Sequence, residues 1–133
     1  MPLTSSKFYQ LATEAALALP GTELYRFTSC SEAEATRVGS KRFMLLAQVE
    51  RRQLINPKAA PDDVRAIQAT YPDAIPAWHM NKTHWYSIQP GPSMTPELVG
   101  ELIAESYLTV VESLPISKRP AGWQDIARQL SEE

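Results

Sequence analysis

Residues 36–49 have the sequence TRVGSKRFMLLAQV, which predicts a β-hairpin leading into a buried strand. Gly39 and Ser40 form a small-residue pair between two strand-like runs, as a tight hairpin loop requires. The run from Lys41 to Val49 is almost continuously apolar, which is typical of a strand covered on both faces. We therefore expect this strand to lie at the centre of the sheet.

The remaining elements are predicted by their hydrophobic periodicity. Helical spacing of apolar residues predicts helices over residues 5–19, 61–71 and 96–114, and a shorter one over 123–130. Alternation predicts strands over 24–28 and 53–56, and two short strands within 75–88 that turn at Asn81 and Lys82. Residues 29–35 are polar and acidic and predict a loop. Pro57 should end its strand or place it on an edge.

Length and composition predict one ordinary globular domain. The chain has 133 residues, of which 44% are hydrophobic and 21% charged. No apolar run approaches the roughly 20 residues that span a bilayer, and the opening MPLTSSK has no signal-peptide pattern. Cys30 is the only cysteine, which excludes an intrachain disulfide and suits a reducing compartment. We expect a cytoplasmic monomer without a membrane partner.

Charge is distributed unevenly along the chain, although the net charge is only −2. Segments 37–58 and 74–96 together hold seven of the 13 basic residues and one of the 15 acidic residues. The other acids lie mainly on the predicted helices and at the termini. This distribution predicts a molecule that is acidic over its helices and basic over its sheet, which is either a functional polarity or a solvated surface without a role.

The segment from Ile75 to Ile88 gathers polar and aromatic side chains. It holds both histidines, two of the three tryptophans and a lysine, with no acidic residue. Hydrogen-bond donors on this projecting element are His79, Asn81, Lys82 and His84. Arg37, Lys41 and Arg42 form a second basic projection around the Gly39–Ser40 turn. Trp78 and Trp85 are each either core residues or stacking platforms, because their facing depends on strand register.

Patterns typical of enzymes are absent from the sequence. His79 and His84 alone do not supply the three or four ligands of a zinc site, and no acid lies between Asp73 and Glu97 to complete one. There is no Gly-x-Ser-x-Gly elbow and no phosphate-binding glycine spacing among the five glycines. We expect a non-enzymatic protein without a metal or cofactor.

Residues 71–85, with the sequence YPDAIPAWHMNKTHW, resemble the MmcQ/YjbR family of small bacterial proteins. The resemblance extends to the VGSKRF segment at 38–43, the predicted helix from Pro61 to Tyr71, and the Ser106–Tyr107 and Leu114–Pro115 pairs. It covers residues 5–119 in the same order. We therefore expect a family domain over residues 1–119 and a C-terminal tail over 120–133, with a short helix in the tail.

The family resemblance implies a single-domain CyaY-like α+β fold, an antiparallel sheet with helices packed on one face. It also implies a "double wing" DNA-binding function in which the exposed sheet saddles a duplex. The chain departs from the family pattern at Pro57 and Ala59, where only Lys58 of a Leu-Lys-Cys run is retained. Trp78 replaces a more usual tyrosine, and Thr83 replaces a basic residue, which removes charge from the turn.

The leading functional hypothesis is weak, largely non-specific binding to double-stranded DNA. Phosphate contacts are expected from Arg37, Lys41, Arg42, Lys58 and Lys82. Hydrogen bonds are expected from His79, Asn81 and His84, and an aromatic surface from Trp85. Five neutralised phosphates would give a slope of about −4 to −5 for log affinity against log salt. The alternatives are a protein-interaction or chaperone-like module using the open sheet, and a small-molecule or metal site at His79 and His84.

Overall fold

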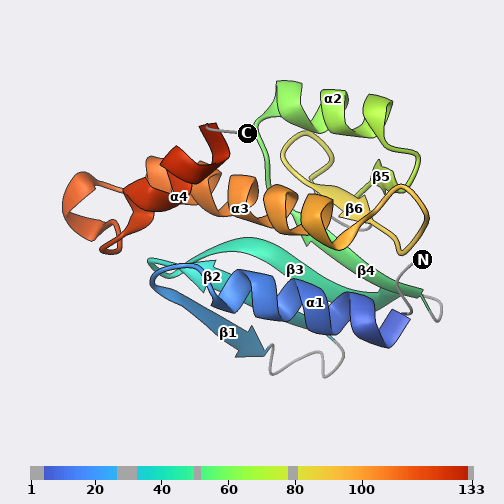
Figure 1. Ribbon diagram of the computed structural model, residues 1–133, viewed down its shortest axis with the longest axis horizontal. Helices are drawn as coiled ribbons and strands as arrows, with labels where there is room; N and C mark the ends of the chain where they lie inside the picture. The colour runs from blue at the N-terminus through green and yellow to red at the C-terminus, as the bar shows by residue number, and fades with distance from the viewer. Residues whose placement is uncertain (1–4, 27–32, 50–51, 78–80, 132–133) are drawn as a thin grey trace.

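Four helices and a six-stranded sheet make up the protein, for which the computed structural model describes residues 5–26, 33–49, 52–77 and 81–131 (Figure 1). The helices are α1 (Ser5–Leu17), α2 (Pro61–Thr70), α3 (Pro96–Ser113) and α4 (Trp123–Ser131), with a short 3-10 helix, η1, at Ile116–Lys118. The strands are β1 (Thr22–Arg26), β2 (Ala33–Val38), β3 (Lys41–Val49), β4 (Arg52–Pro57), β5 (Ala74–Pro76) and β6 (Tyr86–Ile88).

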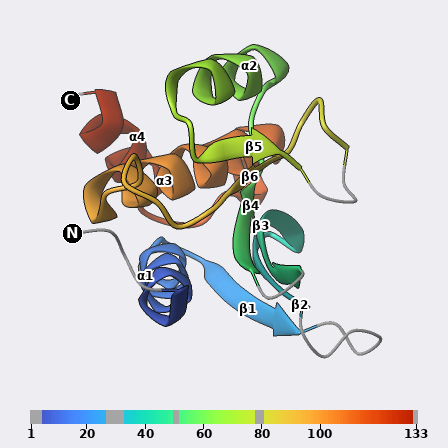
Figure 2. The same ribbon diagram turned by 90° about the vertical axis from the view of Figure 1, so that its right-hand side faces the viewer.

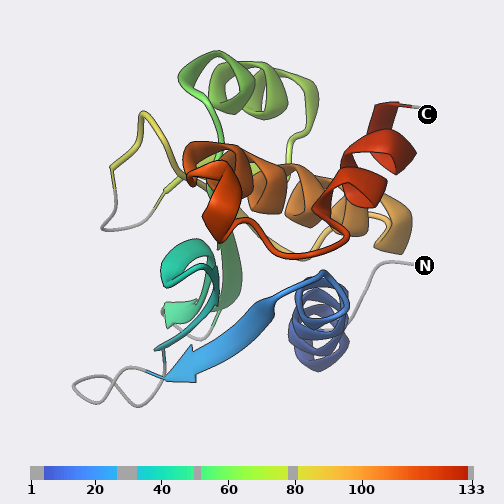
Figure 3. The ribbon, with the colours of Figure 1, turned by 90° about the vertical axis from the view of Figure 1, so that its left-hand side faces the viewer.

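All neighbouring strands are antiparallel, in the order β1-β2-β3-β4-β6-β5. Helices α1 and α3 pack on one face of this sheet, and Figure 2 shows them together on the left of the strands. Helix α4 packs on α3 (Figure 3), and α2 packs beside β5. The predicted α+β class and antiparallel sheet are confirmed.

Strand β3 is third in the six-stranded order, which confirms its predicted central position. Its register with β2 shifts by one residue, because Arg37 pairs with Arg42 whereas Thr36 pairs with Met44. The extra residue is Phe43, and both Phe43 and Met44 are fully buried in the core. A bulge of this kind directs two consecutive side chains to the same face. The ring of Phe43 meets that of Tyr107 on α3 edge-on, with centroids 5.6 Å apart.

One local prediction is wrong, and another is confirmed. Residues 33–35, predicted as part of a loop, belong to β2, because Ala33, Glu34 and Ala35 pair with residues 45–47 of β3. The two short strands predicted within 75–88 are present as β5 and β6, which pair antiparallel and are joined by residues 77–85. The predicted turn lies within this connection, where the Asn81 side chain accepts from the backbone of Thr83.

Helix α3 is joined to the sheet and to the α1–β1 turn by buried polar groups. Ser106 donates to the carbonyl of Phe43 and accepts from the backbone N–H of Lys58 at 2.7 Å. The Tyr107 hydroxyl donates to the carbonyl of Pro20 at 2.6 Å. Burial raises the pKa of Tyr107 to about 12, so it remains a neutral donor at physiological pH. These bonds position the ends of β3 and β4 against the helix.

The segment from Pro120 onward packs on the same core as the rest of the chain. The predicted short C-terminal helix is present as α4, and Trp123, Ile126 and Leu130 pack against the buried cluster. The backbone of Gly21 comes so close to Pro120 that an added Cβ would lie 2.5 Å from its side chain. The last helix therefore extends the domain's helical layer.

The loop before α3 is held by the buried carboxylate of Asp73. It accepts from the backbone N–H of Ser93 at 3.0 Å, from the Ser93 hydroxyl at 2.6 Å and from the Gln89 amide at 3.3 Å. The Ser93 hydroxyl is the main reason that the pKa of Asp73 is lowered from 3.8, and partial desolvation opposes it. These bonds join the residues before β5 to the turn that leads into α3.

The lowered pKa of Asp73 predicts a stability contribution that depends on pH. Because the folded-state pKa lies below the unfolded value, the carboxylate stabilises the fold above about pH 4. This contribution is lost as pH falls through the folded pKa. We expect Asp73→Asn to cost about 1–2 kcal/mol at pH 7, and urea unfolding should show the difference from wild type shrinking when the pH is lowered from 7 to below the ordinary carboxyl pKa of about 4. An equal difference at both pH values would contradict this role.

Candidate nucleic-acid interface

One face of the sheet is turned away from α1 and α3, and we call it the open face. Strand pairing places Tyr25, Ala35, Leu45 and Asn56 in one row across this face. The row continues to Ser87, whose hydroxyl donates to Asn56 at 2.5 Å. Helices α1 and α3 lie on the opposite side of the strands (Figure 2). Any ligand that uses the strands therefore meets this face.

Three cationic side chains occupy adjacent strands at one end of the open face, and we call Arg37, Arg42 and Lys58 the basic row. Arg37 on β2 pairs directly with Arg42 on β3. Lys58, just after β4, donates its backbone N–H to the carbonyl of Phe43 at 3.0 Å, which places it beside the start of β3. Neighbouring strands are about 4.8 Å apart, so the row spans about 10 Å.

An aromatic ring lies at each end of the basic row. The Arg37 guanidinium lies 4.6 Å from the ring centroid of Tyr25, on β1. The Lys58 ammonium lies 5.7 Å from the ring centroid of Trp85, with which Lys58 forms a β-bridge. Both contacts are cation–π interactions, which hold the side chains in defined positions. The sequence does not predict that Lys58 lies beside Trp85, because the two residues are 27 positions apart in the chain.

A hollow of about 270 Å³ opens at the β1 end of the row, lined by Tyr25, Arg37, Ser40 and Arg42. Glu23 lies at its side and forms an ion pair with Arg37, with the Nε and Oε1 atoms 2.5 Å apart. The pair is partly exposed, so its electrostatic energy is modest. The hollow nevertheless combines two guanidinium groups with an aromatic wall.

The middle of the open face is covered, which differs from the expected exposed saddle. Ala35, Leu54, Asn56 and Ser87 are all at most 3% exposed. The Asn56 amide donates to the carbonyl of Leu45 at 3.2 Å, so this polar pair is satisfied within the sheet. Contact with a large ligand is therefore confined to the basic row and its surroundings, where Arg42 is exposed and Arg37 and Lys58 are half-buried.

The remaining predicted site residues are only partly brought together. Lys41 pairs with the buried Val38, so it lies on the helix side of the hairpin, opposite Arg42. Lys82 and His84 are exposed in the connection that precedes Trp85. The side-chain oxygen of Asn81 accepts from the backbone of Thr83 at 2.8 Å, so it shapes the turn. His79 and Trp78 lie outside the described residues.

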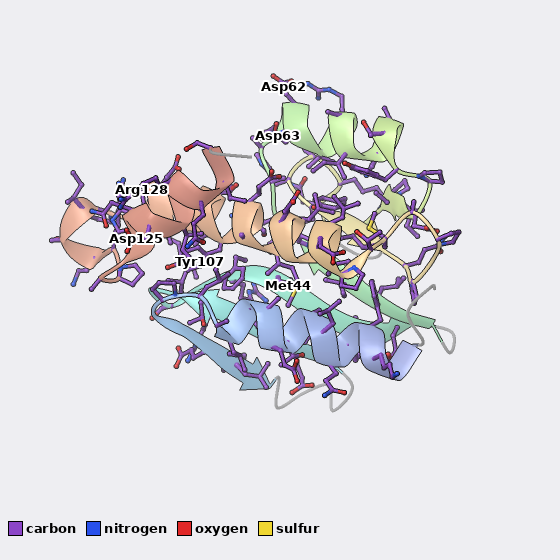
Figure 4. All side chains as sticks on the ribbon, viewed as in Figure 1. Met44, Asp62, Asp63, Tyr107, Asp125 and Arg128 are labelled. Atoms are coloured by element: carbon purple, nitrogen blue, oxygen red, sulfur yellow. The ribbon has the colours of Figure 1, made fainter. Side chains whose placement is uncertain are left out.

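Negative charge is concentrated on the helical layer. Figure 4 shows Asp62 and Asp63 at the start of α2, and Asp125 on α4, on the side away from the sheet. The outer surface of α3 adds further acids, which are Glu97, Glu101, Glu105 and Glu112. Burial, together with Glu105 and Asp63, raises the pKa of Tyr86 and keeps that phenol neutral. The described residues therefore have the predicted polarity.

The structure adds no sign of a metal centre within its described ranges, where no group of three or more potential ligands among His, Cys, Asp and Glu is close enough to hold an ion. The same residues include no helix that is both long and apolar enough to cross a membrane.

Glu23, Tyr25 and Ser40 were missed by sequence reasoning. Their role depends on strand pairing, which brings them to Arg37 and Arg42, and no motif marks them.

Comparison with known proteins places the chain in a family. The YjbR family profile matches residues 17–109. Over 112 residues, the chain is 33% identical to the uncharacterized protein YbdF of Escherichia coli O157:H7. The matched region covers 84% of this chain and 91% of YbdF. The chain belongs to the YjbR family. YjbR of E. coli K12 is 27% identical over 88 residues, covering 66% of this chain and 75% of YjbR.

Solved structures share the fold of this family member. The Deinococcus radiodurans protein DR2400 superposes with a TM-score of 0.69 and 22% identity, covering 93% of this chain and 88% of DR2400. A Pseudomonas syringae protein gives a TM-score of 0.64 and 20% identity, covering 80% of this chain and 98% of that protein. These likenesses concern the fold, and the family membership expected from the sequence is confirmed by the profile match.

Proposed function

We propose that the protein binds DNA without catalysis, through phosphate contacts made by the basic row and by Lys82. The observation that carries this proposal is that Arg37 on β2 pairs with Arg42 on β3, and that Lys58, just after β4, lies beside the start of β3. Cations spaced across a surface can neutralise successive phosphates, and they do so without reading base sequence.

The charge polarity supports the same proposal. A duplex approaching the helical layer would meet the carboxylates of α2 and α3. A duplex approaching the basic row would meet its cations, beside which Glu23 forms an ion pair with Arg37. Opposite charges on opposite faces orient a protein before contact. Because Glu23 is paired with Arg37, part of the positive charge of that arginine is already neutralised, and weak binding is expected.

Salt dependence tests the proposal quantitatively. Since Lys41 lies on the other face, four cations remain, and the slope of log affinity against log salt should be about −3 to −4. Fluorescence anisotropy of a labelled random duplex across a salt series measures it. A slope near zero, or no binding at low salt, would overturn DNA binding through phosphate contacts.

Arg42→Gln and Lys41→Gln form a matched pair for the same assay. Both remove one positive charge from the same hairpin, but only Arg42 lies on the open face. We expect Arg42→Gln to weaken binding roughly fivefold to tenfold at 0.1 M salt, the contribution of about one phosphate contact. Lys41→Gln should change affinity less than about twofold. Equal losses in the two variants would indicate that net charge alone matters.

A second candidate is a protein partner that pairs with the free edge of β1. This strand ends the sheet order, and its Leu24 and Tyr25 are 38% and 37% exposed. An edge with exposed apolar side chains is a template for added strands. A nuclease-resistant complex recovered by pull-down and lost on Leu24→Pro would support this function, whereas recovery that is indifferent to this substitution would argue against it.

A further inference from the structure

We propose that the basic row accepts single-stranded DNA running across the strands, with unpaired bases stacked on Tyr25 at one end and on Trp85 at the other. This inference rests on the proposed function and identifies its preferred substrate. Strand pairing joins Arg37 to Arg42 and Lys58 to Trp85. Tyr25 lies diagonally across from Arg37, whose direct partner on β1 is Glu23, and its ring joins this end of the row through the contact with the Arg37 guanidinium. Aromatic residues on both sides of a line of cations form the arrangement that binds an unpaired strand.

The spacing of the two rings suits a short segment of nucleic acid. Tyr25 lies on β1 and Trp85 lies beside Lys58 at the β6 position, which is four strand spacings away. At about 4.8 Å for each spacing, the rings are about 19 Å apart. At a stacked rise of 3.4 Å per nucleotide, this distance corresponds to about five or six nucleotides.

The β1 end has both a stacking surface and room for a base. Its hollow of about 270 Å³ lies between Tyr25, Arg37 and Arg42. The Arg37 guanidinium is 4.6 Å from the Tyr25 ring, and unpaired bases stack on both kinds of planar group. At the other end, Lys58 stands over the half-buried Trp85 and holds the ring in place.

A duplex cannot use these rings in the same way. The faces of its bases are occupied by their neighbours in the stack, so a duplex meets only the cations. An unpaired strand presents base faces as well as phosphates, and each stacked base adds to the affinity. Single-stranded DNA should therefore bind more tightly than duplex DNA at the same salt concentration.

Three labelled probes of equal length separate stacking from charge. They are an oligothymidine of about 12 nucleotides, a duplex of that length, and an abasic strand with the same number of phosphates. We expect oligothymidine to bind at least about fivefold more tightly than either of the others. Tyr25→Leu and Trp85→Leu should each remove about fivefold of its affinity, while Trp85→Phe retains most of it. The same substitutions should leave abasic binding nearly unchanged.

Different outcomes overturn different parts of the proposal. If the abasic strand binds as well as oligothymidine, stacking is wrong while phosphate binding stands. If the duplex binds as well as oligothymidine, the preference for an unpaired strand is wrong. If no probe binds at low salt, the proposed function itself fails. Should Trp85→Leu fail to fold, Tyr25→Leu still decides the matter, because Tyr25 is 37% exposed and lies outside the buried core cluster.

Discussion

Replacement of Gly91 by alanine is expected to lower the free energy of unfolding by about 3 kcal/mol. A Cβ at this position would lie 2.3 Å from both carboxylate oxygens of Asp73. The carboxylate cannot move without losing hydrogen bonds from Ser93 and Gln89, and bonds to a charged acceptor are the costly ones to lose. Urea unfolding monitored by tryptophan fluorescence measures the change.

Two comparison variants isolate this steric cause. In an Asp73→Ala background the new methyl group meets no carboxylate, so Gly91→Ala should cost less than about 1 kcal/mol there. Gly100→Ala is the second control, because it lies within α3 and a Cβ would meet nothing within 4 Å. Its expected effect is a gain of about 0.5–1 kcal/mol from helix propensity. An undiminished cost of Gly91→Ala in the Asp73→Ala background would refute the proposed clash.

The second large effect is expected at the hairpin, where Gly39→Ala should cost about 2–3 kcal/mol. Gly39 has a φ of 57°, in the left-handed region that alanine adopts unfavourably. Its Cβ would also lie 2.8 Å from a methyl group of the buried Leu114. Both backbone strain and displacement of Leu114 contribute. The same unfolding assay measures the sum.

Neighbouring substitutions separate the two contributions. Gly39→Asn keeps the Cβ contact but tolerates positive φ better, so its cost should be smaller than that of alanine by about 1 kcal/mol. Ser40 has a φ of 67° and is exposed, so Ser40→Gly should stabilise the fold by up to about 1 kcal/mol. A destabilising Ser40→Gly would show that the backbone conformation at the turn has been misjudged.

The hairpin links stability to the proposed function. Gly39 packs against Leu114 at the end of α3, and the strands on either side carry Arg37 and Arg42. Ser106 of the same helix bonds the backbone of Lys58. Helix α3 therefore supports all three members of the basic row from behind the sheet, through contacts made on its buried face.

Most secondary structure was predictable because it follows local periodicity. The N-cap of α3 illustrates this, since Thr95 accepts from the Leu98 N–H at 3.2 Å and Pro96 occupies the first helical position, as its sequence indicates. The loop predicted over residues 29–35 was wrong for residues 33–35. The polar Glu34 favoured a loop, but pairing of Ala33–Ala35 with β3 makes this segment a strand and outweighs local composition. Such pairing is non-local and has no signature within the segment.

In the candidate site, too, some features follow from the local sequence and others depend on non-local pairing. The residue types, the basic hairpin and the membership of the family were all accessible from the sequence. The grouping was not, because side chains alternate between the two faces of a strand, and a shift of one residue exchanges the faces. The register shift at Phe43 keeps Phe43 and Met44 in the core while Arg42 stays on the open face with Arg37. Lys41 is thereby separated from its neighbour in the chain, and Tyr25, Lys58 and Trp85 join the site through pairing across the sheet.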